Sequence, residues 1–289
     1  MIAAWAALLG IYVPKLDAYA SFMPLYAAPV LLGAALAWRS RPWPLVAAAV
    51  ALAPVVGTVT PELLRTIPQA PPGAPQVRIA THNVWNRNTD PAETAQTIID
   101  ARPDVVLLQE AGGSFRPMLA AIRQHFPYST DCPAHCSLVI FSRWPIGSRD
   151  YHFNDAEGRR LEPPLIWAQI LPPGMPPFVV ATLHYGHPSP SQARRRQELA
   201  EAIRQIDARD LVIAGDMNLT PWASAMRVQD KALSPLTRMT RALPSWRRPV
   251  PMLPIDHLYA GLGWGLVDAR RLPATGSDHY PLLITLGRR

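Results

Sequence analysis

Six short apolar runs in this sequence end in side chains that suit metals or phosphates, which favours a fold that gathers strand ends. The clearest run reads LVIAGDMNLTP over residues 211–221 and delivers Asp216 and Asn218 directly after Gly215. Side chains at positions i and i+2 lie on one face of an extended chain. A carboxylate beside an amide can orient a water molecule and hydrogen-bond a charged oxygen. For this segment alone, a turn rich in Asp and Asn is the slightly better interpretation.

The other five apolar runs end in residues of the same kind. Carboxylate and amide oxygens are the usual ligands of hard divalent cations such as Mg²⁺. Each such residue alone is more often a turn residue or a satisfied core histidine. Polar positions that follow six separate apolar strands, however, indicate one shared site. The other runs end at Asn83, Glu110, His184, Asp256 with His257, and Asp278 with His279.

From residue 77 onward, strand-like runs alternate with amphipathic helices, which predicts an α/β fold. Asp90 is expected to cap a helix that has Pro91 at its first position and Glu93 three residues after the cap. The other helices are expected at 114–125 and 191–207. Strands are expected at 77–85, 105–109, 137–141, 165–171, 178–183, 211–214, 255–260 and 281–286.

The charge balance is basic and permits an anionic partner. The chain of 289 residues has a net charge of +7, almost all of it from arginine, with only Lys15 and Lys231 as lysines. Nucleic acid, phosphate and anionic lipid all fit this balance, so charge alone does not choose among them.

The first sixty residues are almost uncharged. Runs at 18–38 and 43–60 approach the roughly 20 apolar residues that cross a bilayer core of about 30 Å. Their prolines are better tolerated in membrane helices than in soluble ones. A buried hairpin of a soluble domain is the less favoured alternative. Residues 1–13 are apolar but short, so a third span is open, and without a basic start they make a poor signal peptide.

Residues 1–64 are therefore predicted to be a membrane anchor of two or three transmembrane helices. Arg39 and Arg41, flanked by Trp38 and Trp43, place the intervening loop in the cytoplasm by the positive-inside rule. The protein is then a multi-pass inner-membrane protein whose remaining chain lies on the periplasmic or extracellular side. Residues 65–76 form a stiff Pro-rich linker, and residues 77–289 form the second domain.

Seven motifs occur in an order that resembles the endonuclease/exonuclease/phosphatase superfamily, which includes deoxyribonuclease I-like nucleases, inositol-polyphosphate 5-phosphatases and neutral sphingomyelinases. The resemblance covers roughly residues 76–286. It implies a four-layer, deoxyribonuclease I-like fold in which two facing β-sheets are flanked by helices. The N-terminal spans lie outside it and resemble the membrane anchor of some bacterial members. The motifs are THNVW, LLQE, FSRWPI, TLHYG, GDMNLTP, IDHLYA and GSDHYPL.

The resemblance also implies roles for individual residues around a Mg²⁺ or Mn²⁺ ion. Superfamily mechanisms differ over whether the aspartate or the histidine is the general base, and the sequence leaves that choice open. The implied roles are metal binding by Glu110, Asn83 and Asp278, activation of water by Asp216, contact with phosphoryl oxygens by Asn218 and His184, and binding of the scissile phosphate by His279, oriented by Asp256.

Two further segments carry candidate substrate-binding residues. Arg196, followed by Gln197, matches a position where superfamily members carry an arginine and a glutamine, although a run of arginines is commonly a solvated face. The loop at 240–254 precedes Asp256 and carries Trp246, which would stack on a base, lie against lipid or simply pack. A loop beside a site is a common place for substrate selection.

The two cysteines, Cys132 and Cys136, lie in the segment DCPAHC. Outside the cytoplasm a disulfide is the favoured interpretation. A closed zinc site needs four ligands, and only three Cys or His residues are local. A reduced buried pair is the remaining alternative.

The resulting functional prediction is a membrane-anchored, divalent-metal-dependent phosphoesterase. A nuclease-like phosphodiesterase and a lipid or inositol-phosphate phosphoesterase are equally favoured. A non-catalytic, membrane-tethered phosphate-binding module is the alternative of another class, and the intact set of polar residues argues against it. The predicted partners are a phosphoester substrate and, through the N-terminal helices, a lipid bilayer; the sequence indicates no protein partner.

Overall fold

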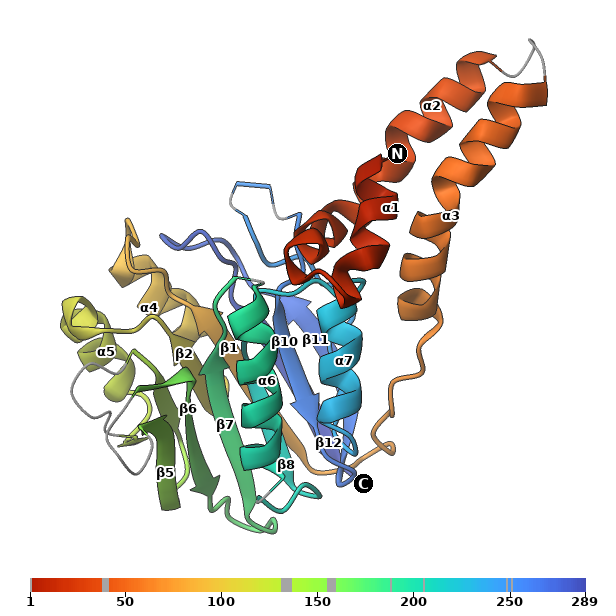
Figure 1. The fold of residues 1–289 in the computed structure, drawn as a ribbon. Helices are drawn as coiled ribbons and strands as arrows, with labels where there is room; N and C mark the ends of the chain where they lie inside the picture. Colours follow the sequence, from red (N-terminus) through yellow and green to blue (C-terminus); the bar gives the residue numbers. More distant parts are fainter. Residues whose placement is uncertain are drawn as a thin grey trace.

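The computed structural model describes residues 2–37, 42–130, 137–154, 160–187, 189–204, 206–247, 249–250 and 252–289. Two six-stranded sheets face each other, and helices lie outside them (Figure 1). One sheet has the order β11-β12-β1-β2-β4-β3, and the other has the order β5-β6-β7-β8-β10-β9. This is the predicted α/β two-sheet arrangement, with the deoxyribonuclease I-like fold.

The bounds of the elements are as follows. The strands are β1 Gln76–Asn83, β2 Val105–Gln109, β3 Tyr128–Ser129, β4 Val139–Ser142, β5 Ile146–Asn154, β6 Arg160–Ile170, β7 Phe178–His184, β8 Leu211–Asp216, β9 Thr237–Arg238, β10 Asp256–Ala260, β11 Trp264–Arg271 and β12 Leu282–Arg288. The helices of this part are α4 Pro91–Asp100, η3 Gly113–Phe115, α5 Arg116–Arg123, α6 Pro190–Ile203 and α7 Ser224–Ala232.

Side chains alternate between the space inside the sandwich and the helical layers, as the two-residue period of a strand requires. Ile79 on β1 and Val212 on β8 lie in the core between the sheets. Their neighbours face outward, because Ala80 packs in the cluster with α4 and α5, whereas Ile213 packs in the cluster with α6 and α7. The molecule therefore has three apolar layers between four structural ones.

Each sheet contains one parallel pair, and these pairs determine where the site forms. β1 pairs with β2 in parallel, and β7 pairs with β8 in parallel. The neighbours β12 and β10 run antiparallel to β1 and β8, so their amino-terminal ends reach the same edge. The polar residues at these strand ends are consequently brought to one edge of the sandwich.

The expected elements are largely present, with informative differences. β2 has the expected bounds, and Asp90 caps α4 by accepting a hydrogen bond from Glu93 N at 2.9 Å. The expected helix at 114–125 begins as a 3-10 turn. Strands β5 and β11 and helix α7 were not expected, because half-exposed segments such as β11, which carries Asp268 and two exposed arginines, lack a continuous apolar run.

The N-terminal region is helical but is divided into several α-helical and 3-10 segments. It comprises α1 Ile2–Leu8, η1 Leu9–Ile11, η2 Pro14–Tyr26, α2 Ala27–Ala37 and α3 Pro42–Leu64. The apolar run at 18–38 falls within the helical stretch Pro14–Ala37, whose first half is a 3-10 helix with Pro24 inside it. By length and composition, Pro14–Ala37 and Trp43–Leu64 are sufficient to cross a membrane. Trp38, Arg39 and Arg41 lie outside the described residues.

The Pro-rich segment at 65–76 packs along the sandwich. Leu266 N on β11 donates to Pro68 O at 2.7 Å, and Ala70 N donates to Leu266 O at 3.0 Å. Ile67 is buried in the core between the sheets. The segment therefore runs beside β11 as a further edge of the sheet and fixes where α3 ends relative to β1.

Candidate active site

The strand register and the residues that directly follow the strands bring five of the predicted residues together. His184 on β7 and Asp256 on β10 are both register partners of Asp216 on β8. Asn83 ends β1, and Glu110 directly follows its neighbour β2. Residues separated by up to 173 positions therefore meet at one edge.

Backbone positions with positive φ angles gather at this edge, among them Trp85 with φ 56° just after β1. At Gly215, with φ 158°, a Cβ would approach Leu183 O to 2.0 Å, so only glycine lets β8 lie this close to β7. Glu110 has φ 56° and Asn218 has φ 49°, in the left-handed region that non-glycine residues seldom occupy. Such conformations cluster at functional sites because surrounding structure must hold them.

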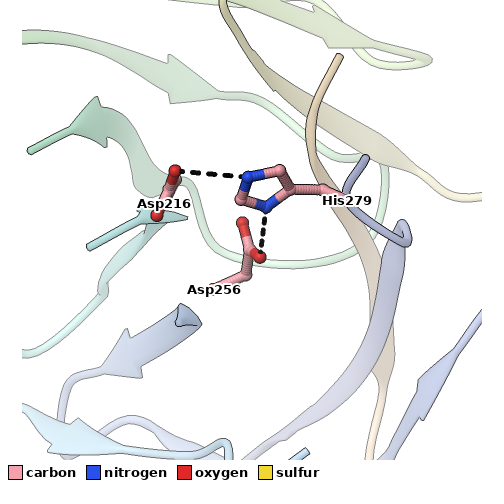
Figure 2. A group of neighbouring side chains, drawn as sticks. All are labelled: Asp216, Asp256 and His279. Carbon is pink, nitrogen blue, oxygen red and sulfur yellow. Dashed lines mark hydrogen bonds and ion pairs between the residues drawn. The ribbon is translucent and has the colours of Figure 1, made fainter. Parts of the chain in front are cut away.

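His279 lies between two aspartates in a buried cluster, which Figure 2 shows. Its Nδ1 is 2.8 Å from Asp256 Oδ2, and its Nε2 is 3.7 Å from Asp216 Oδ2. Ser245 Oγ donates to the same Asp256 oxygen at 2.6 Å. One ligand atom from each of the three residues in Figure 2 lies within 4.8 Å of the others, so the trio could also surround a metal ion.

The electrostatics of this trio favour a charged imidazole. Burial alone would lower the pKa of His279, but Asp256 and Asp216 outweigh it and raise that pKa to about 9. Burial raises the pKa of Asp216. Burial acts in the same direction on Asp256, but the charge and hydrogen bond of His279 hold its pKa below the usual value. A charged imidazole carries a proton on both ring nitrogens and has no lone pair for a metal, so in this state His279 can donate a proton and is not itself a metal ligand.

A second group of polar side chains surrounds Glu110. Asn83 Nδ2 donates to Glu110 Oε1 at 2.9 Å and to Asp216 Oδ2 at 3.1 Å. Asn86 N donates to Glu110 Oε2 at 2.9 Å. His184 Nε2 lies 3.8 Å from Glu110 Oε1 and 3.5 Å from Asp216 Oδ2. Glu110 and His184 are the partly exposed members, so this group faces the solvent side of the site.

Asp278 completes the set of oxygen donors. Trp246 Nε1 donates to Asp278 Oδ2 at 2.9 Å. The other oxygen, Oδ1, is buried, lies 3.9 Å from His279 Nε2, and has no hydrogen-bond partner among the described residues. A buried carboxylate oxygen without a donor is available to a cation, and carboxylates with an amide are the donor set that Mg²⁺ takes. Glu110 and Asp278 therefore fit a hard divalent ion. Asn83 turns its Nδ2 toward Glu110 and accepts from Trp85 N at Oδ1, so metal binding by Asn83 stays a prediction.

Asn218 is held by its own loop. Its backbone N donates to Asp216 Oδ1 at 2.8 Å, and its side-chain Nδ2 donates to Tyr185 O at 2.7 Å. Arg196 lies behind it, with Nη2 3.2 Å from Met217 O and its guanidinium 4.6 Å from the Tyr185 ring centroid. Arg196 is buried and contacts main-chain oxygens here; its role in substrate binding stays a prediction.

Two serines that the sequence did not single out connect the motifs. Ser277 Oγ donates to Asn83 O at 2.8 Å and accepts from His279 N at 3.0 Å, joining β1 to the segment before β12. Ser245 holds Asp256 from the loop at 240–254. The only sequence signal for either was proximity to a motif, because serine is common in loops. Cys132 and Cys136 lie outside the described residues, so the predicted disulfide stays a prediction.

Comparison with known proteins identifies the family. The family model described as Endonuclease/Exonuclease/phosphatase family matches residues 80–279, well over half of the chain. No curated protein was found to match the chain in sequence.

Solved structures with the same fold include three of different kinds. The endonuclease/exonuclease/phosphatase from Beutenbergia cavernae DSM 12333 has 21% identity and a TM-score of 0.59, with 74% of this chain and 72% of that chain covered. Sphingomyelinase C from Streptomyces griseocarneus has 16% identity and a TM-score of 0.54, with 74% and 100% covered. A beta toxin mutant from Staphylococcus aureus with bound magnesium ions has 14% identity and a TM-score of 0.57, also with 74% and 100% covered. Together with the motif residues gathered at one edge, the family match shows that the chain is a phosphoesterase of the endonuclease/exonuclease/phosphatase family.

Proposed function

We propose that the protein hydrolyses a phosphodiester or phosphomonoester by attack of a water molecule, with Mg²⁺ or Mn²⁺ as its cofactor. The observation that carries this proposal is the adjacency of two different donor groups. The trio of Asp216, Asp256 and His279 is suited to moving a proton, and it adjoins Glu110 and Asp278, which are suited to holding a cation.

Glu110 and Asp278 are the residues that would hold the metal, and Asn83 would orient Glu110. The unpartnered oxygen of Asp278 supports this assignment, as do the magnesium ions in the Staphylococcus aureus beta toxin structure. A bound divalent cation would supply positive charge against the negative charge that develops on phosphoryl oxygens. The amide of Asn83 keeps Glu110 and Asp216 adjacent by donating to both.

Asp216 is proposed to orient the attacking water and accept its proton. Its Oδ1 is held by Asn218 N, and its raised pKa brings it closer to the range in which a carboxylate accepts a proton. His279, kept positively charged by the flanking aspartates, donates from Nε2 to a phosphoryl oxygen. Asp256 accepts a hydrogen bond from the Nδ1–H group of the ring and thereby fixes the ring orientation.

His184 and Asn218 are proposed to contact the phosphoryl oxygens from the opposite side. His184 Nε2 lies within 4 Å of both Glu110 and Asp216 and is partly exposed, so it borders the space that a phosphoryl group would enter. Donors arranged around a developing oxyanion stabilise the transition state because they need no reorganisation during the reaction.

The test is metal-dependent turnover by the purified full chain in detergent. Hydrolysis of bis(p-nitrophenyl) phosphate or p-nitrophenyl phosphate is expected with Mg²⁺ or Mn²⁺, to stop with EDTA, and to return when the metal is restored. Turnover that persists in EDTA would contradict the cofactor, and no turnover of either ester or of a broad phosphoester panel would contradict the proposed reaction.

A further inference from the structure

The N-terminal helices pack against the loop that carries part of the active site. Ala20 and Met23 of η2 are fully buried and share one apolar cluster with Met217, Leu219 and Trp222. Asn218 lies within that short segment. Trp222 Nε1 also donates to Ser21 O at 3.4 Å. The face on which the helices dock is therefore the carboxyl end of β8, the same edge that holds the catalytic residues.

A buried aspartate secures this contact. The residue before α7 is Ala223, which has no side-chain oxygen to cap the helix. Asp17 of η2 supplies the cap, because its two carboxylate oxygens accept from Ser224 N at 2.7 Å and Ala225 N at 2.8 Å. Asp17 is only 2% exposed. The cap satisfies two backbone N–H groups at the start of α7, and here it joins segments more than 200 residues apart.

A second connection lies at the end of α3. Arg238 on β9 forms ion pairs with Glu62 Oε2 at 2.8 Å and Asp230 Oδ2 at 3.0 Å, and its side chain is 1% exposed. Arg65 reinforces it by donating to Arg238 O at 2.6 Å and to Thr240 O at 2.9 Å. Breaking a buried ion pair leaves an uncompensated charge, so this joint resists bending. We call Glu62, Arg65, Asp230 and Arg238 the α3 joint.

Away from these connections, the helices present apolar surface with no partner among the described residues. Leu31 and Leu36 on α2 and Trp43 on α3 are exposed. α3 has 23 residues, a length of about 35 Å at 1.5 Å per residue, which exceeds a bilayer core of about 30 Å. In Figure 1 the α2–α3 hairpin projects away from the end of the sandwich on which η2 docks.

The loop at 240–254 adds a further apolar element at the active-site edge. It begins at the α3 joint, because Arg241 Nη1 donates to Leu63 O at 2.9 Å. It then contacts the site through Ser245 and Trp246. Beyond these residues it exposes Val250 (65%) and Met252 (48%) beside the exposed Arg247. Apolar side chains next to a basic one suit the headgroup region of a membrane.

From this arrangement we infer that the active-site edge is held against the bilayer and that the scissile phosphoester belongs to a lipid headgroup of the same membrane. The inference rests on the proposed function and gives it a substrate class. The N-terminal helices are connected to the sandwich both at Asp17 and at the α3 joint. The site therefore has little freedom to turn toward bulk solvent. A polynucleotide would have to arrive from solution, whereas lipids of the same membrane reach a site held at its surface at high effective concentration.

The test uses the full chain reconstituted into vesicles of equimolar phosphatidylcholine, phosphatidylglycerol and sphingomyelin, with Mg²⁺. Phosphorus NMR follows headgroup release from the enzyme's own vesicles and from separate enzyme-free vesicles. The same preparation is given plasmid DNA and bis(p-nitrophenyl) phosphate. Headgroup release from at least one lipid is expected, at least about tenfold faster in the enzyme's own vesicles than in separate ones, with no cleavage of plasmid DNA.

A variant of the α3 joint tests the orientation itself. Glu62→Gln removes one charge from the joint, and Glu198→Gln is a matched control that breaks an exposed pair with Arg194. Only Glu62→Gln should lower lipid turnover, by about tenfold, while hydrolysis of the soluble ester is retained and reports that the domain is folded. Equal loss on both substrates, or no loss on lipid, would overturn the role of the joint.

The remaining outcomes separate this inference from the proposed function. Metal-dependent cleavage of plasmid DNA or of the soluble ester without headgroup release would overturn the lipid inference and leave the proposed reaction standing. Failure to hydrolyse any substrate with Mg²⁺ or Mn²⁺ would overturn the proposed function itself.

Discussion

The active-site edge of the sandwich and the N-terminal helices are held in place by different kinds of interaction. At the edge, His184, Asp216 and Asp256 are placed by strand register, so each position follows from a continuous ladder of backbone hydrogen bonds. The helices are joined to the same edge by apolar packing and a few isolated polar residues, chiefly Asp17 and Glu62. The position of the site therefore rests on many backbone hydrogen bonds, whereas the position of the helices rests on apolar packing and a few polar side chains.

Substitution of Asp216 should have the largest effect on the catalytic rate. Asp216→Ala is expected to lower kcat for a soluble phosphoester by at least about 100-fold, because it removes the proposed proton acceptor. Unfolding and association with membranes should remain as in the original chain. Steady-state kinetics with Asp268→Ala as the control, an exposed aspartate on β11, would measure this. A near-normal rate would show that Asp216 does not activate water.

Trp246→Phe tests whether the loop at 240–254 acts on the metal or on substrate alone. The change keeps an aromatic ring but removes the donor to Asp278 Oδ2. Loss of a hydrogen bond to a metal ligand typically costs 10- to 100-fold in metal affinity, so the Mg²⁺ concentration for half-maximal rate should rise about tenfold. Trp5→Phe, at an exposed position on α1, is the control. An altered KM with unchanged Mg²⁺ dependence would assign Trp246 to substrate contact instead.

Asp17→Ala should have the smallest effect, and it should fall on the helices rather than on the chemistry. Removing the cap of α7 is expected to lower the free energy of unfolding by about 1 kcal/mol. Denaturant unfolding in detergent micelles, with Asp268→Ala as the control, would measure it. A loss of turnover as large as that of Asp216→Ala would mean that docking of η2 is needed to form the site.

The same contrast explains what the sequence could predict. The residues at the strand ends were found because an apolar run followed by a polar residue marks a strand end, and parallel strands bring such ends together. The bounds of β2 and the cap of α4 at Asp90 followed from equally local signals. The bonds of Ser245 to Asp256 and of Trp246 to Asp278 could not be predicted, because they depend on the path of an irregular loop.

The docking of the N-terminal helices on the sandwich could not be predicted from the sequence for a related reason. Asp17 and Glu62 are two charges in an apolar region, and their partners lie 207 and 176 residues away. Neither spacing nor composition identifies such partners. The long apolar runs predicted helices, but neither the 3-10 conformation of η2 nor its packing against the α6–α7 layer is revealed by a helical period.

The most direct test of the account is where a divalent ion binds. Two candidate donor sets meet at this edge: Asp216, Asp256 and His279 form one, and Asp278 beside His279 with Glu110 near Asp216 forms the other. Electron paramagnetic resonance of Mn²⁺ bound to the full chain would compare Glu110→Gln with Asp256→Asn. The account predicts that Glu110→Gln loses bound Mn²⁺ and that Asp256→Asn retains it. Retention in Glu110→Gln with loss in Asp256→Asn would contradict the assignment by placing the ion among the trio.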